Sequence, residues 1–249
     1  MTPESSARKP RVALFITCLG DQFFPQVGES VVRILRRLGV EVTFNPTQTC
    51  CGQPAFNTGY PQEAREVATR VLDLFDDADY VVAPSGSCTS MIRVFYPELF
   101  AGDPARLRKA QQLGERFFEF SEFLVNVLKV EDVGASFPRR VAYHDSCHLL
   151  RELGIEEQPR KLIRAVRGLE LLELEDNQLC CGFGGTFSVK FPEVSVAMGE
   201  DKLRAATAAG AEVLVANDSG CLMHLAGVIH RQGLPLKTMH LAELLARQE

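Results

Sequence analysis

The sequence contains no tryptophan, no long apolar run and no block of charge of one sign. Its longest apolar strings, such as residues 12–18 and 80–83, fall far short of the roughly 18 residues that a membrane span needs. Residues 1–10 lack the apolar stretch of a secretory signal. The net charge of −5, spread along 249 residues, argues against nucleic acid as the main partner. We therefore expect a soluble cytoplasmic protein without a membrane span.

Several common cofactor and redox motifs are also missing. No two cysteines stand in a C-x-x-C pair, which argues against a thioredoxin-like dithiol. The Gly-Phe-Gly-Gly loop at residues 182–185 matches neither G-x-G-x-x-G nor GxxxxGK[ST], so no nucleotide site is indicated. The chain carries no flavin-binding signature of its own. Its 46% hydrophobic content is that of an ordinary globular protein, long enough for one large core or two smaller domains.

Eight cysteines stand out against these absences. In a reducing cytosol, clustered cysteines more often indicate metal binding or redox chemistry than structural disulfides. Buried structural thiols are the alternative, but that interpretation suits one or two scattered cysteines. Here the cysteines form two sets of four, and each member of the second set follows its counterpart by 129 to 133 residues. The two sets are Cys18, Cys50, Cys51 and Cys88, then Cys147, Cys180, Cys181 and Cys221.

The residues around the cysteines repeat as well. The first half has the pattern C-x31-CCG-x35-C and the second half a near variant of it. Eight cysteines in register within two copies of one pattern indicate an internal duplication. The matching segments are residues 12–18 and 141–147, 47–52 and 177–182, 80–88 and 213–221, and 120–124 and 241–245.

Hydrophobic periodicity predicts an α/β fold. Short β-branched and apolar runs alternate with stretches of helical spacing, and the order β-α-β-α-β favours a parallel sheet with right-handed crossovers. We expect two tandem, pseudo-equivalent Rossmann-like units, each a mainly parallel sheet flanked by helices. The expected strands are residues 12–17, 40–44 and 80–83, then 140–144, 169–174 and 213–216; the expected helices are 27–38, 62–75 and 106–119, then 159–166 and 194–209.

We place the boundary between the units near residue 138. The first unit spans residues 11–138 and includes a linker helix, and the second spans 139–249. The phenylalanines at positions 117, 118, 120 and 123 read as a core-facing helical stripe or a subunit contact. In each unit the cysteines follow strands, at the carboxyl edge where open α/β sheets bind their ligands. Cys18, Cys88, Cys147 and Cys221 are expected near helix starts, where the dipole favours thiolate.

Four converging thiols per half suit a metal–sulfide cluster. Iron–sulfur clusters are commonly held by four cysteine thiolates, and a glycine after each pair, Gly52 and Gly182, lets backbone N–H groups approach. Tetrahedral zinc also accepts four thiolates, but its cysteines usually come as C-x2–4-C rather than as adjacent pairs. The spacing favours iron–sulfur over zinc and leaves both open. A vicinal redox disulfide ranks third.

Three segments carry a family resemblance: residues 48–60, 147–154 and 180–192. The CCG repeats resemble the cysteine-rich domain found in heterodisulfide reductases and in the iron–sulfur subunits of glycolate oxidase, and the three segments are similar to the lactate-utilisation members of that family. The resemblance covers roughly residues 11–246. It implies an electron-transfer subunit of a complex that oxidises L-lactate to pyruvate, with iron–sulfur clusters of the 4Fe-4S type, one per half. It also implies two partners, one a ferredoxin-like iron–sulfur protein, and an oxidoreductase subunit without an identified catalytic residue.

The sequence departs from the fuller family pattern at the last cysteine of each motif. Where that pattern ends in C-x-x-C, this sequence has Ser85 and Met91 in the first half and Asp218 and His224 in the second. Four thiolates still suffice for a cubane cluster. The departure leaves open whether a cluster is non-cubane and whether both sites are filled. Heterodisulfide-type thiol chemistry is the remaining alternative function, and the missing cysteines argue against it.

Histidines accompany only the second set. His148 and His224 are possible additional metal ligands, and a histidine ligand would raise the reduction potential of a cluster. Hydrogen bonding at a loop is the ordinary alternative for both. His144 lies at a strand end, where we expect a structural role. Arg151 and Lys190 either bind a carboxylate or balance cluster charge, or are simply solvated.

Overall fold

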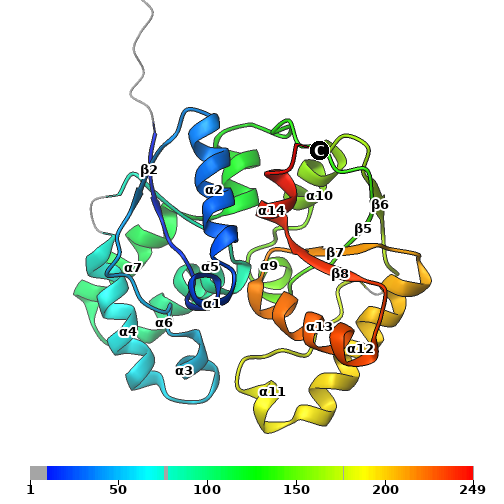
Figure 1. Ribbon diagram of the computed structural model, residues 1–249. Coiled ribbons are helices and arrows are strands. Elements are labelled where there is room, and N and C mark those ends of the chain that lie inside the picture. The colour runs from blue at the N-terminus through cyan, green and yellow to red at the C-terminus, as the bar shows by residue number, and fades with distance from the viewer. Residues whose placement is uncertain (1–9, 76–77, 176, 249) are drawn as a thin grey trace, which may run out of the picture.

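The computed structural model describes residues 10–75, 78–175 and 177–248 (Figure 1). The first half alternates short strands with helices and ends in a π-helical turn. Its elements are β1 (Arg11–Leu14), α1 (Cys18–Phe23), α2 (Pro25–Arg37), β2 (Glu41–Phe44), α3 (Gln53–Asn57), α4 (Pro61–Leu74), β3 (Tyr80–Ala83), α5 (Gly86–Ser90), η1 (Met91–Phe95), α6 (Tyr96–Leu99), α7 (Pro104–Glu115), β4 (Phe117–Glu119), α8 (Phe120–Glu122) and η2 (Phe123–Val127).

The second half repeats the alternation with fewer helices. Its elements are β5 (Arg140–Tyr143), α9 (Cys147–Arg151), α10 (Glu157–Arg164), β6 (Glu170–Leu172), α11 (Phe187–Lys190), α12 (Pro192–Ala208), β7 (Val213–Ala216), α13 (Ser219–Gln232), β8 (Lys237–His240) and α14 (Leu241–Leu245). None of the helices in the described residues combines the length and apolar composition that a bilayer crossing requires.

Across the described residues the strands form two parallel four-stranded sheets with the orders β2-β1-β3-β4 and β6-β5-β7-β8. This arrangement confirms the expected α/β fold of two pseudo-equivalent units. The inner strands β3 and β7 are almost wholly apolar and buried, as a sheet covered on both faces requires. The edge strand β2 is largely exposed and carries Glu41 and Thr43.

The sequence pattern does not predict the fourth strand of either sheet: β4 lies within the helix expected over residues 106–119, and β8 lies beyond the last expected strand. Helix α7 ends at Glu115, and Phe117 to Glu119 pair in parallel with β3, so the predicted helix over residues 106–119 is wrong at its end. Phe117, Phe120 and Phe123 are nonetheless fully buried, as a core stripe predicts. The turn after each fourth strand begins with a capping box, formed by Glu119 in one half and His240 in the other.

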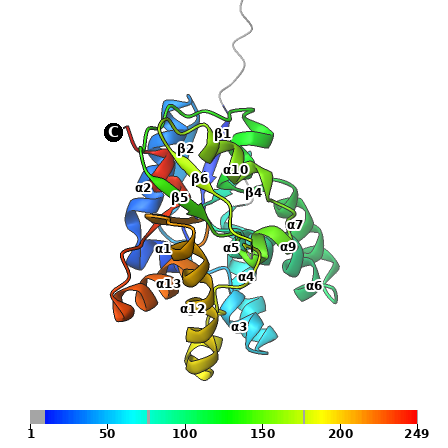
Figure 2. The same ribbon diagram turned by 90° about the vertical axis from the view of Figure 1, so that its right-hand side faces the viewer.

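The two halves lie side by side (Figure 1; Figure 2). Each helix contact between them occurs twice, once with each half in either role. Helix α5 packs on α9, and α13, the counterpart of α5, packs on α1, the counterpart of α9. Helix α14 likewise packs on α2, and α10 on α8. One hydrophobic core contains residues of both halves, including Val31 and Leu244. This pseudo-two-fold arrangement brings the carboxyl edges of both sheets toward each other.

A buried polar network also joins the halves at these edges. The Glu119 carboxylate accepts hydrogen bonds from the backbone N–H groups of Ser121 and Glu122 and from Asn217 Nδ2, 2.9 Å away at the end of β7. Tyr143 donates its hydroxyl to Asn217 Oδ1 at 2.9 Å. Burial raises the pKa of Glu119 to about 7 despite these donors.

We expect the contribution of Glu119 to stability to fall as the pH rises from about 4.5 to about 7. A carboxyl group whose pKa is higher in the folded protein stabilises the fold fully below its unfolded pKa, and that contribution disappears as the pH passes the folded pKa. The shift of Glu119 corresponds to about 3 kcal/mol. Urea unfolding at a series of pH values should show that the stability of the wild type falls across this range relative to that of Glu119→Gln, and that the exposed control Glu66→Gln behaves as the wild type does. The same pH dependence in Glu119→Gln as in the wild type would show that another group is responsible.

Candidate metal centre

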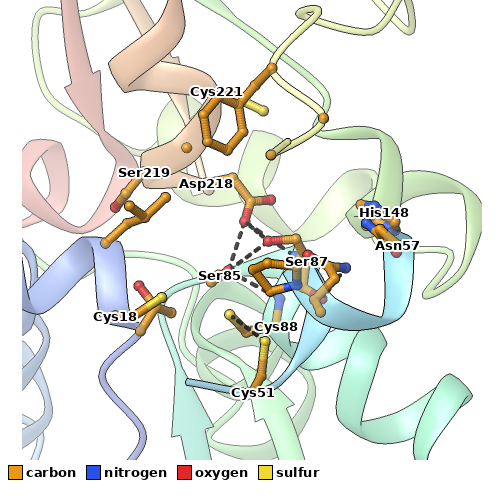
Figure 3. A pocket seen from close by; sticks show the side chains of 18 of the residues that line it. Cys18, Cys51, Asn57, Ser85, Ser87, Cys88, His148, Asp218, Ser219 and Cys221 are labelled. Atoms are coloured by element: carbon orange, nitrogen blue, oxygen red, sulfur yellow. Dashed lines mark hydrogen bonds between the residues drawn. The ribbon is translucent and has the colours of Figure 1, made fainter. Parts of the chain in front are cut away.

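All eight cysteines line one cavity of about 130 Å³. Figure 3 shows this cavity with Cys18, Cys51, Cys88 and Cys221 labelled. Each of the eight is a free thiol. Cys18 and Cys147 are the first residues of α1 and α9, while Cys88 and Cys221 lie in the first turns of α5 and α13. The prediction that these four cysteines stand at helix starts is therefore confirmed.

The first set brings its sulfur atoms into contact in two pairs. Cys18 Sγ lies 3.7 Å from Cys50 Sγ, and Cys51 Sγ lies 3.3 Å from Cys88 Sγ. Cys51 and Cys88 are buried, whereas Cys18 is exposed at the cavity mouth. Three separate strand-end segments thus deliver four sulfurs to one place, as the sequence pattern predicts.

The glycine that follows each cysteine pair has two structural tasks. Gly52 and Gly182 have φ angles of 87° and 91°, in the left-handed region that side chains disfavour. Their N–H groups point at Cys50 Sγ and Cys180 Sγ, each at 3.4 Å. A Cβ at Gly182 would stand 2.4 Å from the Ser195 carbonyl oxygen, so only glycine fits beneath α12. The shared geometry of the two glycines holds one thiol of each set under a backbone donor.

Polar bridges fix the loops that carry the cysteines. In the first half Gln48 accepts from the Ile16 N–H at 2.7 Å and donates to the Leu14 carbonyl at 3.2 Å, linking the end of β1 to the segment before Cys50. In the second half Asp145, just after β5, makes the corresponding link to the segment before Cys180. It receives a bidentate pair from Arg160 at 2.8 and 2.6 Å and a bond from Asn177 Nδ2 at 2.8 Å.

Adjacent thiols in each set compete for protons. Hydrogen bonds from Cys18 and then Cys51 lower the pKa of Cys50 to about 3, and the pKa of Cys18 rises because its thiol donates to Cys50 and is partly buried. In the second set, bonds from Cys147 and then Cys181 lower the pKa of Cys180 to about 2. Four thiolates so close together would repel one another, so full deprotonation needs a bound cation. This is the chemistry of a metal-binding donor set.

A carboxylate lies between the two sets. Asp218 Oδ1 accepts bonds from the hydroxyls of Ser85 and Ser87, both at 2.7 Å, and from the Ser87 N–H at 3.2 Å. Figure 3 shows this bridge between Cys221 and Cys88. Ser85 and Asp218 are two of the four positions at which the sequence departs from the C-x-x-C pattern. The sequence identifies them as departures but does not predict that they bind each other across the halves.

The histidines occupy different surroundings. His148 lines the cavity, with Nδ1 3.1 Å from the Glu152 carboxylate. His224 Nε2 lies 3.0 Å from the Ser195 carbonyl oxygen, and His224 is not among the residues that line the cavity. The roles of both as ligands stay predictions. His144, expected to be structural, has a ligand atom within 4.8 Å of the sulfurs of Cys181 and Cys221.

The two basic residues considered for carboxylate binding lie outside the cysteine sets. Arg151 is exposed and donates to the Gln178 carbonyl at 3.3 Å. Lys190 is exposed at the end of α11. Neither is among the residues that line the cavity.

Comparison with known proteins agrees with the sequence pattern. The model of the cysteine-rich CCG domain family matches the chain twice, over residues 12–93 and 141–226. Lactate utilization protein A of Exiguobacterium sp. is 50% identical over 238 residues, covering 95% of this chain and 97% of the relative. The protein of the same name from Bacillus subtilis is 47% identical over 235 residues, covering 94% of this chain and 98% of the relative. The expected family is therefore confirmed.

A solved structure supports the fold. A hypothetical protein from Helicobacter pylori superposes with a TM-score of 0.68 at 12% identity. The match covers 96% of this chain but only 49% of that one, so the chain spans about half the length of this structural neighbour. At such low identity the likeness concerns the fold alone.

Proposed function

The chain belongs to the cysteine-rich CCG domain family that includes lactate utilization protein A, and from this premise we propose that it is an iron–sulfur electron-transfer subunit of a complex oxidising L-lactate to pyruvate. The observation that carries the proposal is the convergence of two matched four-cysteine sets on one cavity. The substrate comes from the name of the relatives.

The residues of each set fit an iron–sulfur cluster. Each half supplies four thiols, two of them from adjacent cysteines, and one backbone N–H directed at a sulfur. An adjacent pair grips a polynuclear body at two points, whereas a single zinc ion favours spaced cysteines. We propose Cys18, Cys50, Cys51 and Cys88 as the first ligand set and Cys147, Cys180, Cys181 and Cys221 as the second.

A bound cluster supplies one-electron transfer. The chain's own residues contribute the rest. The buried Cys51, Cys88, Cys181 and Cys221 keep water from the inner side of each site, while the Gly52 and Gly182 N–H groups offset negative charge on sulfur. Because both sets line one cavity, electrons can pass from one site to the other inside the protein.

We also propose the wider arrangement of the complex. The chain forms two units, residues 11–138 and 139–249, and each unit holds one site. The complex acts in the cytoplasm. The partners are further subunits of the lactate-oxidising complex, one of them a ferredoxin-like iron–sulfur protein.

Heterodisulfide-type chemistry remains a second candidate on one observation. Both cysteine sets line the same cavity, so a small disulfide could contact both of them. If this candidate is correct, the reduced, metal-loaded protein alone will cleave low-molecular-weight disulfides. An electron-transfer subunit will not.

The proposed function is tested in the assembled complex under strict anaerobiosis. We expect L-lactate to bleach the visible absorption of the wild-type complex, and D-lactate to have no effect. Cys51→Ser should lower the bleached amplitude of this chain by about half, since one of its two sites is lost. Bleaching that is the same with and without this chain would contradict the proposal.

A further inference from the structure

The two sites differ behind the cysteines. The internal repeat aligns Phe15, just after β1, with His144, just after β5. Both side chains are fully buried. Phe15 packs its ring against Phe75 and Phe117, with ring centroids 5.8 and 5.6 Å apart. The first site therefore has an apolar back wall and the second has an imidazole.

The two ring nitrogens of His144 lie in a buried environment without ordinary hydrogen-bond partners among the described residues. Within the described residues neither ring nitrogen makes a well-aligned hydrogen bond. Its neighbours include Cys181 and Cys221: one ring nitrogen of His144 and the two sulfurs lie within 4.8 Å of one another. A buried polar group without a partner is rare and calls for a bound partner or a functional role.

We propose that His144 donates an N–H hydrogen bond to the Cys221 thiolate of the loaded second site and so makes that site the better electron acceptor. The inference rests on the proposed iron–sulfur function. A donor to a cluster thiolate offsets the charge that reduction adds, and hydrogen bonds to the sulfurs are among the features that set cluster potentials. Phe15 offers no such donor to the first site. Electrons that enter this chain should therefore settle in the second half.

Redox titration followed by EPR tests the proposal. Cys51→Ser and Cys181→Ser backgrounds leave one site each and assign the signals. In protein with both sites, one electron should prefer the second site at least tenfold, equivalent to 59 mV for a one-electron couple. His144→Phe, which copies the first half, should lower the preference about tenfold. His144→Gln, which keeps an N–H donor, should retain most of it, and Phe15→Leu should leave the second-site potential unchanged.

Pulsed EPR supplies a readout independent of the potential. A nitrogen coupling from the imidazole should appear at the second site of the wild type and vanish in His144→Phe. If iron and sulfide are present but the second-site potential and the nitrogen coupling are the same in His144→Phe, the role of His144 is refuted and the proposed function stands. If the anaerobic wild-type protein lacks iron and sulfide, the proposed function itself fails.

Discussion

Replacing Gly182 with alanine should empty the second cysteine site and leave the first site filled. The new Cβ would stand 2.4 Å from the Ser195 carbonyl oxygen, on the backbone of α12, which cannot rotate away as a side chain can. The φ angle of 91° adds strain of about 1–2 kcal/mol. Together the two effects should lower the free energy of unfolding by about 3 kcal/mol or more. They should also pull the Gly182 N–H away from Cys180 Sγ.

Two further glycines serve as matched controls. Gly59 has a similar φ of 85°, but a Cβ there meets nothing within 4 Å among the described residues, so Gly59→Ala tests the backbone strain alone. Gly52→Ala should fall between the two, because its Cβ would lie 3.2 Å from the Ala64 carbonyl oxygen. Iron content and urea unfolding measure the series. Equal destabilisation of all three variants would show that close packing under the cysteine pair is unimportant.

Replacing Asp218 with alanine should loosen the junction between the halves. The substitution leaves the buried Ser85 hydroxyl and the half-buried hydroxyl and N–H of Ser87 without their shared acceptor. Unsatisfied buried groups cost about 1–3 kcal/mol each, and partial access to the cavity reduces the sum to about 3 kcal/mol. We expect lower stability and weaker electron exchange between the two sites, measured by unfolding and by the EPR coupling of the two clusters.

The control for Asp218→Ala is Asp201→Ala, which breaks only an exposed ion pair with Arg204 and should change stability by less than about 1 kcal/mol. A double-mutant cycle with Ser85→Ala isolates the bond across the halves. Additive effects of Ser85→Ala and Asp218→Ala would mean that this bond does not join the two units.

The buried central strands are predictable because their residues are apolar throughout. β3 and β7 read as strands from Tyr80–Ala83 and Val213–Ala216 alone. The fourth strands are not. β4 is three residues long and continues the phenylalanine stripe of a helical pattern, and its strand conformation depends on pairing with β3. Tertiary contact decides that element against local periodicity.

The cysteine sets follow from their register in the repeat, but their shared cavity does not. Convergence of the two sets depends on α5 packing on α9 and α13 on α1, and no local pattern encodes contacts between helices so far apart in sequence. The proposed role of His144 could have been inferred from the alignment of the two repeats. Its counterpart Phe15 is apolar, and an exchange of phenylalanine for histidine at a buried strand end indicates a difference between the two sites.

Metal and sulfide analysis of anaerobically prepared protein tests the central claim most directly. Two filled sites should give iron and acid-labile sulfide in equal amounts, and Cys51→Ser and Cys181→Ser should each lose about half of both. The remaining half should belong to the unaltered set in each variant. Protein with all eight thiols intact that contains stoichiometric zinc, or neither iron nor sulfide, would contradict the account.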